Sequence, residues 1–157
     1  MAAPSITVVN SKDETINTWD AGVIQANNES AVLQIYVWNN RNGSTALSDL
    51  QSANITALDI DGSANSDVVA GKWVKVNVPS VDGNKTTWTP VGGSDTKALK
   101  GTNVTSGNTI KGSTNNGSKD DPDAKSNYCE VNLKVVVPVH ATPGTKSFKM
   151  RINGYYV

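Results

Sequence analysis

The chain has 157 residues with 14 basic and 14 acidic side chains, so its formal net charge is zero and only 18% of its residues are charged. This balance excludes a protein that binds nucleic acid or an anionic membrane mainly by electrostatic attraction. Asn, Ser and Thr together supply 48 residues and Gly another 13. Such a composition excludes a helical bundle and favours short strands joined by long loops. The length predicts a single domain, residues 1–157.

Cysteine and histidine each occur once, at Cys129 and His140. A single cysteine cannot form an intramolecular disulfide, and one residue of each kind cannot build the zinc sites that need them in spaced pairs. The first residues lack the basic and apolar regions of a signal peptide, and no later segment approaches a membrane span. We therefore expect a chain that is not exported and carries no cofactor.

Alternation of apolar and polar residues predicts the strands, because successive side chains of a pleated strand point to opposite faces. In the first half of the chain the pattern is clearest at residues 31–39 and 72–78. Asn, Gly, Asp and Pro close each run, as expected for turns. Further short strands are expected at residues 5–9, 16–19, 54–60 and 86–90, and a single helical turn at residues 45–50.

The second half of the chain contains a long polar segment and then two strands. Residues 101–127 are mostly Gly, Asn, Ser, Thr, Lys and Asp, with Val104 and Ile110 as the sizeable apolar residues. We expect this segment to form a long polar loop excursion from the sheet, partly mobile in isolation. Residues 128–138 and 148–153 alternate apolar and polar residues, with Val136 as the one exception on the polar side. A short loop joins them, so together they resemble a hairpin.

About seven strands, each with one apolar face and no alternation with helices, predict an all-β, two-sheet antiparallel β-sandwich. A jelly roll with two Greek keys is the alternative, because periodicity counts strands but does not order them.

Two segments resemble immunoglobulin-like modules. Residues 19–40 begin with Trp-Asp-Ala-Gly-Val and end a strand in Asn-Asn, which is similar to the opening of such modules. Residues 137–152 contain Val-Pro-Val-His-Ala-Thr-Pro-Gly-Thr followed by an alternating strand, similar to their closing hairpin. The resemblance implies an immunoglobulin-like sandwich and says nothing about activity, since this fold hosts many unrelated functions.

A short, Asn- and Thr-rich immunoglobulin-like chain without an export signal is also similar to small virion proteins of phages that infect Gram-positive bacteria. In those families such domains decorate the capsid or belong to the neck and tail. The resemblance implies a non-enzymatic structural protein, made in the host cytoplasm and located in the virion. Its expected partner is the lattice of the major capsid or tail protein, with self-association as a further contact.

The candidate interaction surface consists of aromatic and basic residues that oppose the apolar face of their strands. Trp73 alternates with Val74 and is expected to face outward with Lys75, while Tyr36 and Trp38 oppose the apolar residues of their strand. Exposed aromatic rings with polar neighbours are typical of a protein interface or of a sugar-stacking platform. The latter gives the alternative function, a carbohydrate-binding or adhesion module. In a third interpretation, loops or a second layer cover the rings.

Catalytic and metal sites find little support. His140 lies in a loop between prolines with no partner that the sequence can locate, so it is expected to be an exposed loop residue and no catalytic residue is assigned. Cys129 is in phase with apolar neighbours and is expected to be buried. Alternate Asp residues at positions 59–61 and 120–123 offer calcium ligands or ordinary turns. The closing Glu of a calcium loop is missing, so no metal site is assigned.

Overall fold

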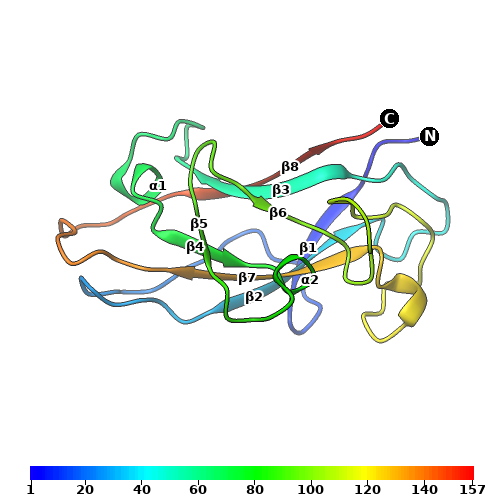
Figure 1. Ribbon diagram of the computed structural model, residues 1–157, viewed down its shortest axis with the longest axis horizontal. Helices are drawn as coiled ribbons and strands as arrows, with labels where there is room; N and C mark the ends of the chain where they lie inside the picture. The colour runs from blue at the N-terminus through cyan, green and yellow to red at the C-terminus, as the bar shows by residue number, and fades with distance from the viewer.

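Two antiparallel sheets stack face to face in the computed structural model, which describes all 157 residues (Figure 1). The expected all-β sandwich is confirmed, with eight strands. The five-stranded sheet contains, in spatial order, β1 (Ile6–Asn10), β2 (Leu33–Asn39), β7 (Tyr128–Val135), β4 (Val74–Asn77) and β5 (Thr89–Val91). The three-stranded sheet contains β6 (Lys97–Ala98), β3 (Gln51–Leu58) and β8 (Lys149–Tyr155).

The core lies between the sheets and follows from the alternation in the central strands. In β7, Cys129, Val131, Leu133 and Val135 are all buried on the inner face, as their spacing predicts. They belong to a cluster of 20 buried residues to which both sheets contribute. Burying each Val, Leu or Ile side chain stabilises the fold by about 1.5–3 kcal/mol, which makes this layer the main source of stability.

Helical structure is confined to three short turns. They are α1 (Asp67–Ala70), α2 (Pro79–Asp82) and the 3-10 turn η1 (Pro122–Ala124). Ser66 caps α1 by accepting the Val69 N–H, and proline begins both α2 and η1, where its missing N–H has no helical partner to lose. None of these turns has the length or apolar character that crossing a membrane requires.

The predicted hairpin of the last two strands is wrong. β7 pairs with β2 and β4, whereas β8 pairs with β3 in the other sheet. Residues 136–148 therefore cross from one sheet to the other. Alternation does not distinguish this arrangement from a hairpin, because the strands alternate in both. Two smaller predictions also differ: residues 16–19 are not a strand, and residues 45–50 form no helical turn. Instead, Leu50 forms a β-bridge with Ile110.

Residues 101–127 contain no strand, in keeping with their composition, yet they pack closely on the sandwich. Ile110 is part of the main core, and Ala124 is fully buried in a second, smaller cluster with Trp38. Gly112 passes so close to residue 47 that a Cβ there would lie 2.3 Å from the Leu47 carbonyl oxygen. This segment is therefore a covering layer of the fold, and removing residues 112–125 is expected to destabilise the domain.

Buried asparagines hold the covering layer in place. Asn127 is fully buried, and its side-chain amide donates to the carbonyls of Lys111 (3.0 Å) and Ser113 (2.8 Å). Asn39, at the end of β2, is also fully buried and donates to the carbonyls of Ser48 (3.0 Å) and Ile110 (3.2 Å). Satisfying these loop carbonyls removes the cost of burying irregular backbone.

Candidate functional site

Trp38 is fully buried, so it does not form part of an exposed surface. Its ring lies 4.7 Å from that of Tyr128, centroid to centroid, and packs with Ala124 of the covering layer. The indole N–H has no hydrogen-bond partner. Trp38 does face away from the main core, as the alternation predicts, but residues 101–127 cover it.

Trp73 is also buried, with 7% of its surface accessible, so the prediction that it faces outward is wrong. β4 begins only at Val74, and Lys72 has a positive φ of 54°. Strand alternation therefore does not extend back to Trp73. Its backbone bonds to Val68 and Val136, and its side chain belongs to the main core.

Tyr36 and Lys75 are half-buried and lie on different strands of the five-stranded sheet, β2 and β4, with β7 between them. The Lys75 ammonium donates to the Lys72 carbonyl (3.2 Å), and its pKa is lowered by burial and by Lys134. The four predicted residues thus do not form one surface. Tyr36 and Trp73 line separate cavities, that of Tyr36 on the outer face of the sheet and that of Trp73 beside residues 141–146.

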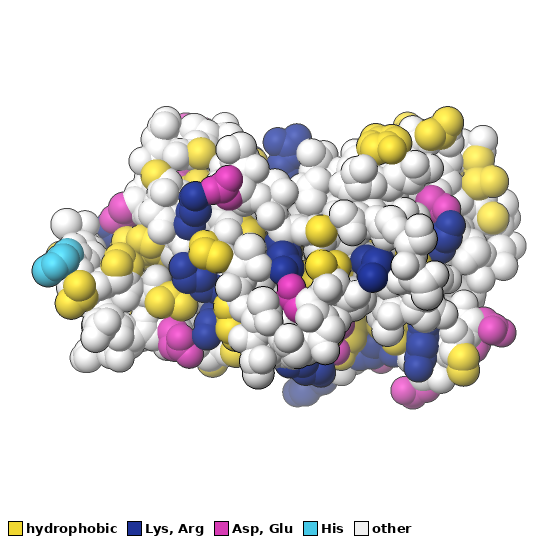
Figure 2. Space-filling model, viewed as in Figure 1, with side chains coloured by type: hydrophobic (Ala, Val, Ile, Leu, Met, Phe, Trp, Pro, Cys, Tyr) yellow, Lys and Arg dark blue, Asp and Glu magenta, His cyan; other side chains and the backbone are white.

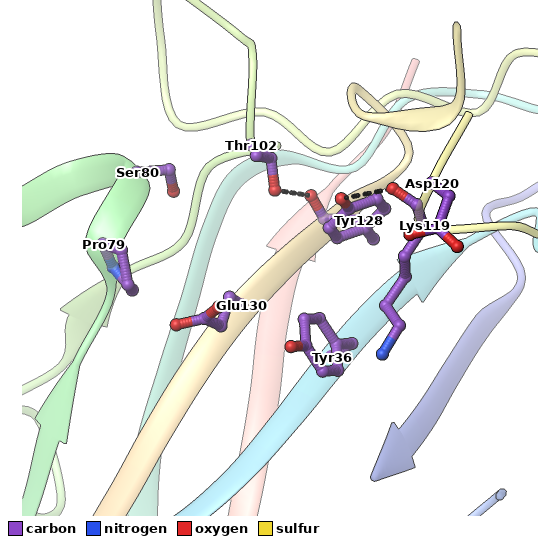
Figure 3. Close-up of a pocket in the computed structure, with 8 residues that line it drawn as sticks. All are labelled: Tyr36, Pro79, Ser80, Thr102, Lys119, Asp120, Tyr128 and Glu130. Atoms are coloured by element: carbon purple, nitrogen blue, oxygen red, sulfur yellow. Dashed lines mark hydrogen bonds between the residues drawn. The ribbon is translucent and has the colours of Figure 1, made fainter. Parts of the chain in front are cut away.

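This cavity, the Tyr36 pocket, has a volume of about 460 Å³ and opens on the outer face of the five-stranded sheet (Figure 3). Tyr36 and Glu130 are direct cross-strand neighbours of β2 and β7, which places both side chains on the same face. The other walls come from α2 and the covering layer. The lining residues are Tyr36, Pro79, Ser80, Thr102, Lys119, Asp120, Tyr128 and Glu130.

Charge is balanced in the Tyr36 pocket. The Lys119 ammonium sits 3.8 Å from the centroid of the Tyr36 ring and 3.4 Å from the Asp13 carboxylate. Glu130 pairs with Lys85 at 3.2 Å. Burial, and then the charge of Glu130, raises the pKa of Tyr36, so its hydroxyl stays protonated at neutral pH. The sequence reasoning missed Glu130, Lys119 and the rest of this pocket, because only the strand register and the covering layer bring them together.

A second candidate surface is the edge strand β8, which pairs with β3 alone and leaves its other side open. The three remaining sheet edges are protected. Residue 15 bridges to β1, β5 has three residues including Pro90, and β6 has only two residues. Natural sheets protect their edges in these ways because an open edge pairs with other chains. With seven residues, β8 is the one long open edge of the sandwich.

The open edge runs into an exposed apolar group at the end of the molecule where both termini lie, seen as the hydrophobic side chains at the upper right of Figure 2. Ser48 ties the two ends together, since its N–H donates to the Ala2 carbonyl (2.9 Å) and its hydroxyl to the Val157 carbonyl (3.2 Å). Tyr155 and Tyr156 are each more than half exposed. We call Met1, Tyr155, Tyr156 and Val157 the terminal patch.

The remaining sequence candidates lie elsewhere. His140 is exposed in the loop at the opposite end of the molecule, where Figure 2 shows the single histidine. Cys129 is buried as expected, and desolvation raises the pKa of its thiol to about 12, which keeps it unreactive.

The carboxylate of Asp59 holds together the loop that contains it. This carboxylate accepts hydrogen bonds from the hydroxyls of Ser63 and Ser66 and from the N–H groups of Asn65 and Ser66. These bonds, that from the Ser66 hydroxyl above all, lower the pKa of Asp59 to about 2. Asp121 likewise caps η1 through the Asp123 N–H (2.9 Å). No three His, Cys, Asp or Glu side chains converge as metal ligands.

Comparison of the chain with models of protein families, with curated proteins and with solved structures found no match. The features of the molecule that bear on function are the Tyr36 pocket, the open edge and the terminal patch.

Proposed function

We propose that this chain is a non-enzymatic structural protein of a bacteriophage virion, an immunoglobulin-like sandwich that docks on the capsid or on the neck or tail. The observation that carries the proposal is the open edge of β8 next to the terminal patch. The other three sheet edges are short or covered, so the chain leaves open one place at which a neighbouring protein can add a strand.

The charges on β8 indicate what kind of strand can pair there. Lys149 and Arg151 are exposed on the outer face of the strand. Antiparallel pairing of two copies over the whole strand, centred on Ile152, would place Arg151 opposite Asn153, so it would gain no cross-strand ion pair. A strand from the capsid or tail lattice with Asp or Glu at the facing positions would instead gain a cross-strand ion pair. The edge therefore favours a different protein as partner over a second copy of this chain.

The terminal patch supplies the apolar part of the proposed contact. Tyrosine is enriched among the residues that contribute most to binding, because it buries a large rigid ring and keeps a hydroxyl for hydrogen bonding. Tyr155 and Tyr156 follow directly on the open edge, so one partner strand can contact both. Many copies on a repetitive lattice would then stabilise it by mass action.

The alternative function, a carbohydrate-binding or adhesion module, no longer has the exposed tryptophans proposed as its stacking platforms. A sugar ring cannot stack on Trp38 or Trp73, because both indoles are buried in the fold. Any carbohydrate binding would have to use another surface.

Quantitative mass spectrometry of phage particles, purified after lysis is induced in the source bacterium, tests the proposal. We expect the chain to co-purify with the particles. A copy number in the hundreds relative to the major capsid protein indicates the capsid or tail tube, and a few to a few dozen indicates the neck or baseplate. Its complete absence from purified particles would refute the proposed function.

A further inference from the structure

We infer that the Tyr36 pocket binds a neutral saccharide unit. This inference goes beyond the proposed function and does not depend on it, since the pocket lies on the outer face of the five-stranded sheet and the open edge belongs to the other sheet.

Unused hydrogen-bonding groups in the pocket point to a ligand that both donates and accepts. The Asp120 carboxylate accepts no hydrogen bond from the chain, and the Tyr36 hydroxyl has no partner in it. Glu130 accepts from Asn132 (3.1 Å) and Lys85 (3.4 Å) on its two oxygens and retains further acceptor capacity. The hydroxyl groups of a sugar can donate to the carboxylates and accept from the tyrosine.

Charge distinguishes a neutral ligand from an ion. Two carboxylates, Asp120 and Glu130, line the pocket, and two ammonium groups, those of Lys119 and Lys85, stand beside them. An anion such as phosphate would meet the carboxylates, and an organic cation would meet the lysines. Lys119 already occupies the cation position over the Tyr36 ring. A neutral polyhydroxylated ligand gains the hydrogen bonds without either repulsion.

The remaining walls fit the same ligand class. Pro79 and the buried ring of Tyr128 give the pocket apolar surface for the C–H groups of a sugar. Two hydrogen bonds hold the Tyr128 wall in position: the Tyr128 hydroxyl donates to the Lys119 carbonyl (3.1 Å), and Thr102 donates to the Tyr128 carbonyl (3.2 Å) (Figure 3). A volume of about 460 Å³ lies within the range of small-ligand sites.

Saturation-transfer NMR on the full chain tests the inference, with the methyl glycosides of glucose, galactose, rhamnose and N-acetylglucosamine as probes. Galacturonate and glucosamine serve as the anionic and cationic probes. We expect saturation of at least one neutral glycoside and none of the charged sugars. Tyr36→Phe and Asp120→Asn should each weaken binding about fivefold to tenfold, the effect of losing one or two hydrogen bonds.

Two control variants match these changes in chemistry. Tyr156→Phe removes an exposed tyrosine hydroxyl in the terminal patch, and Asp61→Asn removes an exposed carboxylate in the loop after β3. Both should bind the glycosides as the unmodified chain does. The inference is overturned if no neutral glycoside receives saturation, if only a charged sugar does, or if all four variants bind equally.

Discussion

Strand β2, in the covered half of the five-stranded sheet, and the open edge strand β8 have similar sequence patterns but differ in exposure. Both strands alternate apolar residues with polar or aromatic ones, at Tyr36 and Trp38 in β2 and at Arg151 and Tyr155 in β8. Residues 101–127 fold over the first and bury Trp38, whereas no part of the chain covers the second. The exposure of an aromatic residue thus depends on which distant segment packs on its strand, and the uncovered edge is the better candidate for an interface.

Removing the ring of Trp38 should have the largest effect on stability. We expect Trp38→Ala to lower the free energy of unfolding by about 3–5 kcal/mol, because it leaves a cavity beneath the covering layer. Trp38→Phe should lose much less, since it keeps a ring and removes an indole N–H that has no partner. Urea unfolding measures both. A loss in Trp38→Ala no larger than that in Val23→Ala, where the side chain is fully exposed, would mean that the covering layer does not pack as described.

The protected edge at β6 offers a second comparison with the open edge. Lys97 in β6 forms an ion pair with Asp82, and both side chains are at most 10% exposed. Lys97→Met should destabilise the fold by about 3 kcal/mol, because Asp82 is left as a buried charge without its cation. We expect the low end of the usual range, since the Val78 N–H and the Asn77 amide still donate to Asp82. Thermal and urea unfolding of Lys85→Met, whose ammonium is exposed, provide the control.

Gly112 tests how tightly the covering layer is seated. A methyl group there would meet the carbonyls of Leu47 and Ser48, so Gly112→Ala should cost about 2 kcal/mol through displaced backbone. The tryptophan fluorescence of the native state should also change if the layer above Trp38 shifts. Gly62→Ala, in an open loop where nothing lies near the new methyl group, is the control without a clash. Because φ is positive at Gly62 and not at Gly112, this control sets an upper limit on the cost of replacing a glycine there without close packing. Equal losses in the two variants would argue against close packing at Gly112.

The smallest effect is expected at the exposed loop that follows β3. The folded-state pKa of Asp59 lies at about 2, below its ordinary value of 3.8, so its ionised form stabilises the fold above pH 4. This contribution is lost as the pH falls through about 2. Asp59→Asn should therefore be less stable than the unmodified chain at pH 6, with the difference shrinking in acid. Unfolding curves between pH 6 and pH 2 that stay parallel for the two proteins would show that the carboxylate does not hold the loop.

The local alternation of apolar and polar residues predicted which side chains lie on the inner faces of the strands. The spacing of Cys129, Val131 and Leu133 was sufficient to predict their burial, because alternation is a property of the strand alone. The pairing of β8 was not accessible in this way, since the same alternation suits a hairpin or a crossing between sheets. The prediction that Trp73 faces outward failed because β4 begins at Val74, two residues after the predicted start and beyond the positive φ of Lys72.

The candidate sites needed longer-range information. Tyr36 and Glu130 are 94 positions apart in sequence and become neighbours only through the register of β2 and β7. The open edge is likewise a property of the whole sheet order. A signal for the terminal patch was present, since Tyr155, Tyr156 and Val157 directly follow an alternating strand. Its exposure became evident only when the other edges were seen to be protected.

Docking through the open edge can be measured most directly by co-sedimenting the purified protein with phage particles from a strain that lacks its gene. The account predicts that the unmodified chain and Lys12→Glu, a charge reversal in the turn after β1, occupy the same number of sites. Arg151→Glu, on the edge itself, should leave nearly all of these sites unoccupied while the protein remains folded. Equal occupancy by Arg151→Glu and the unmodified chain would contradict the account.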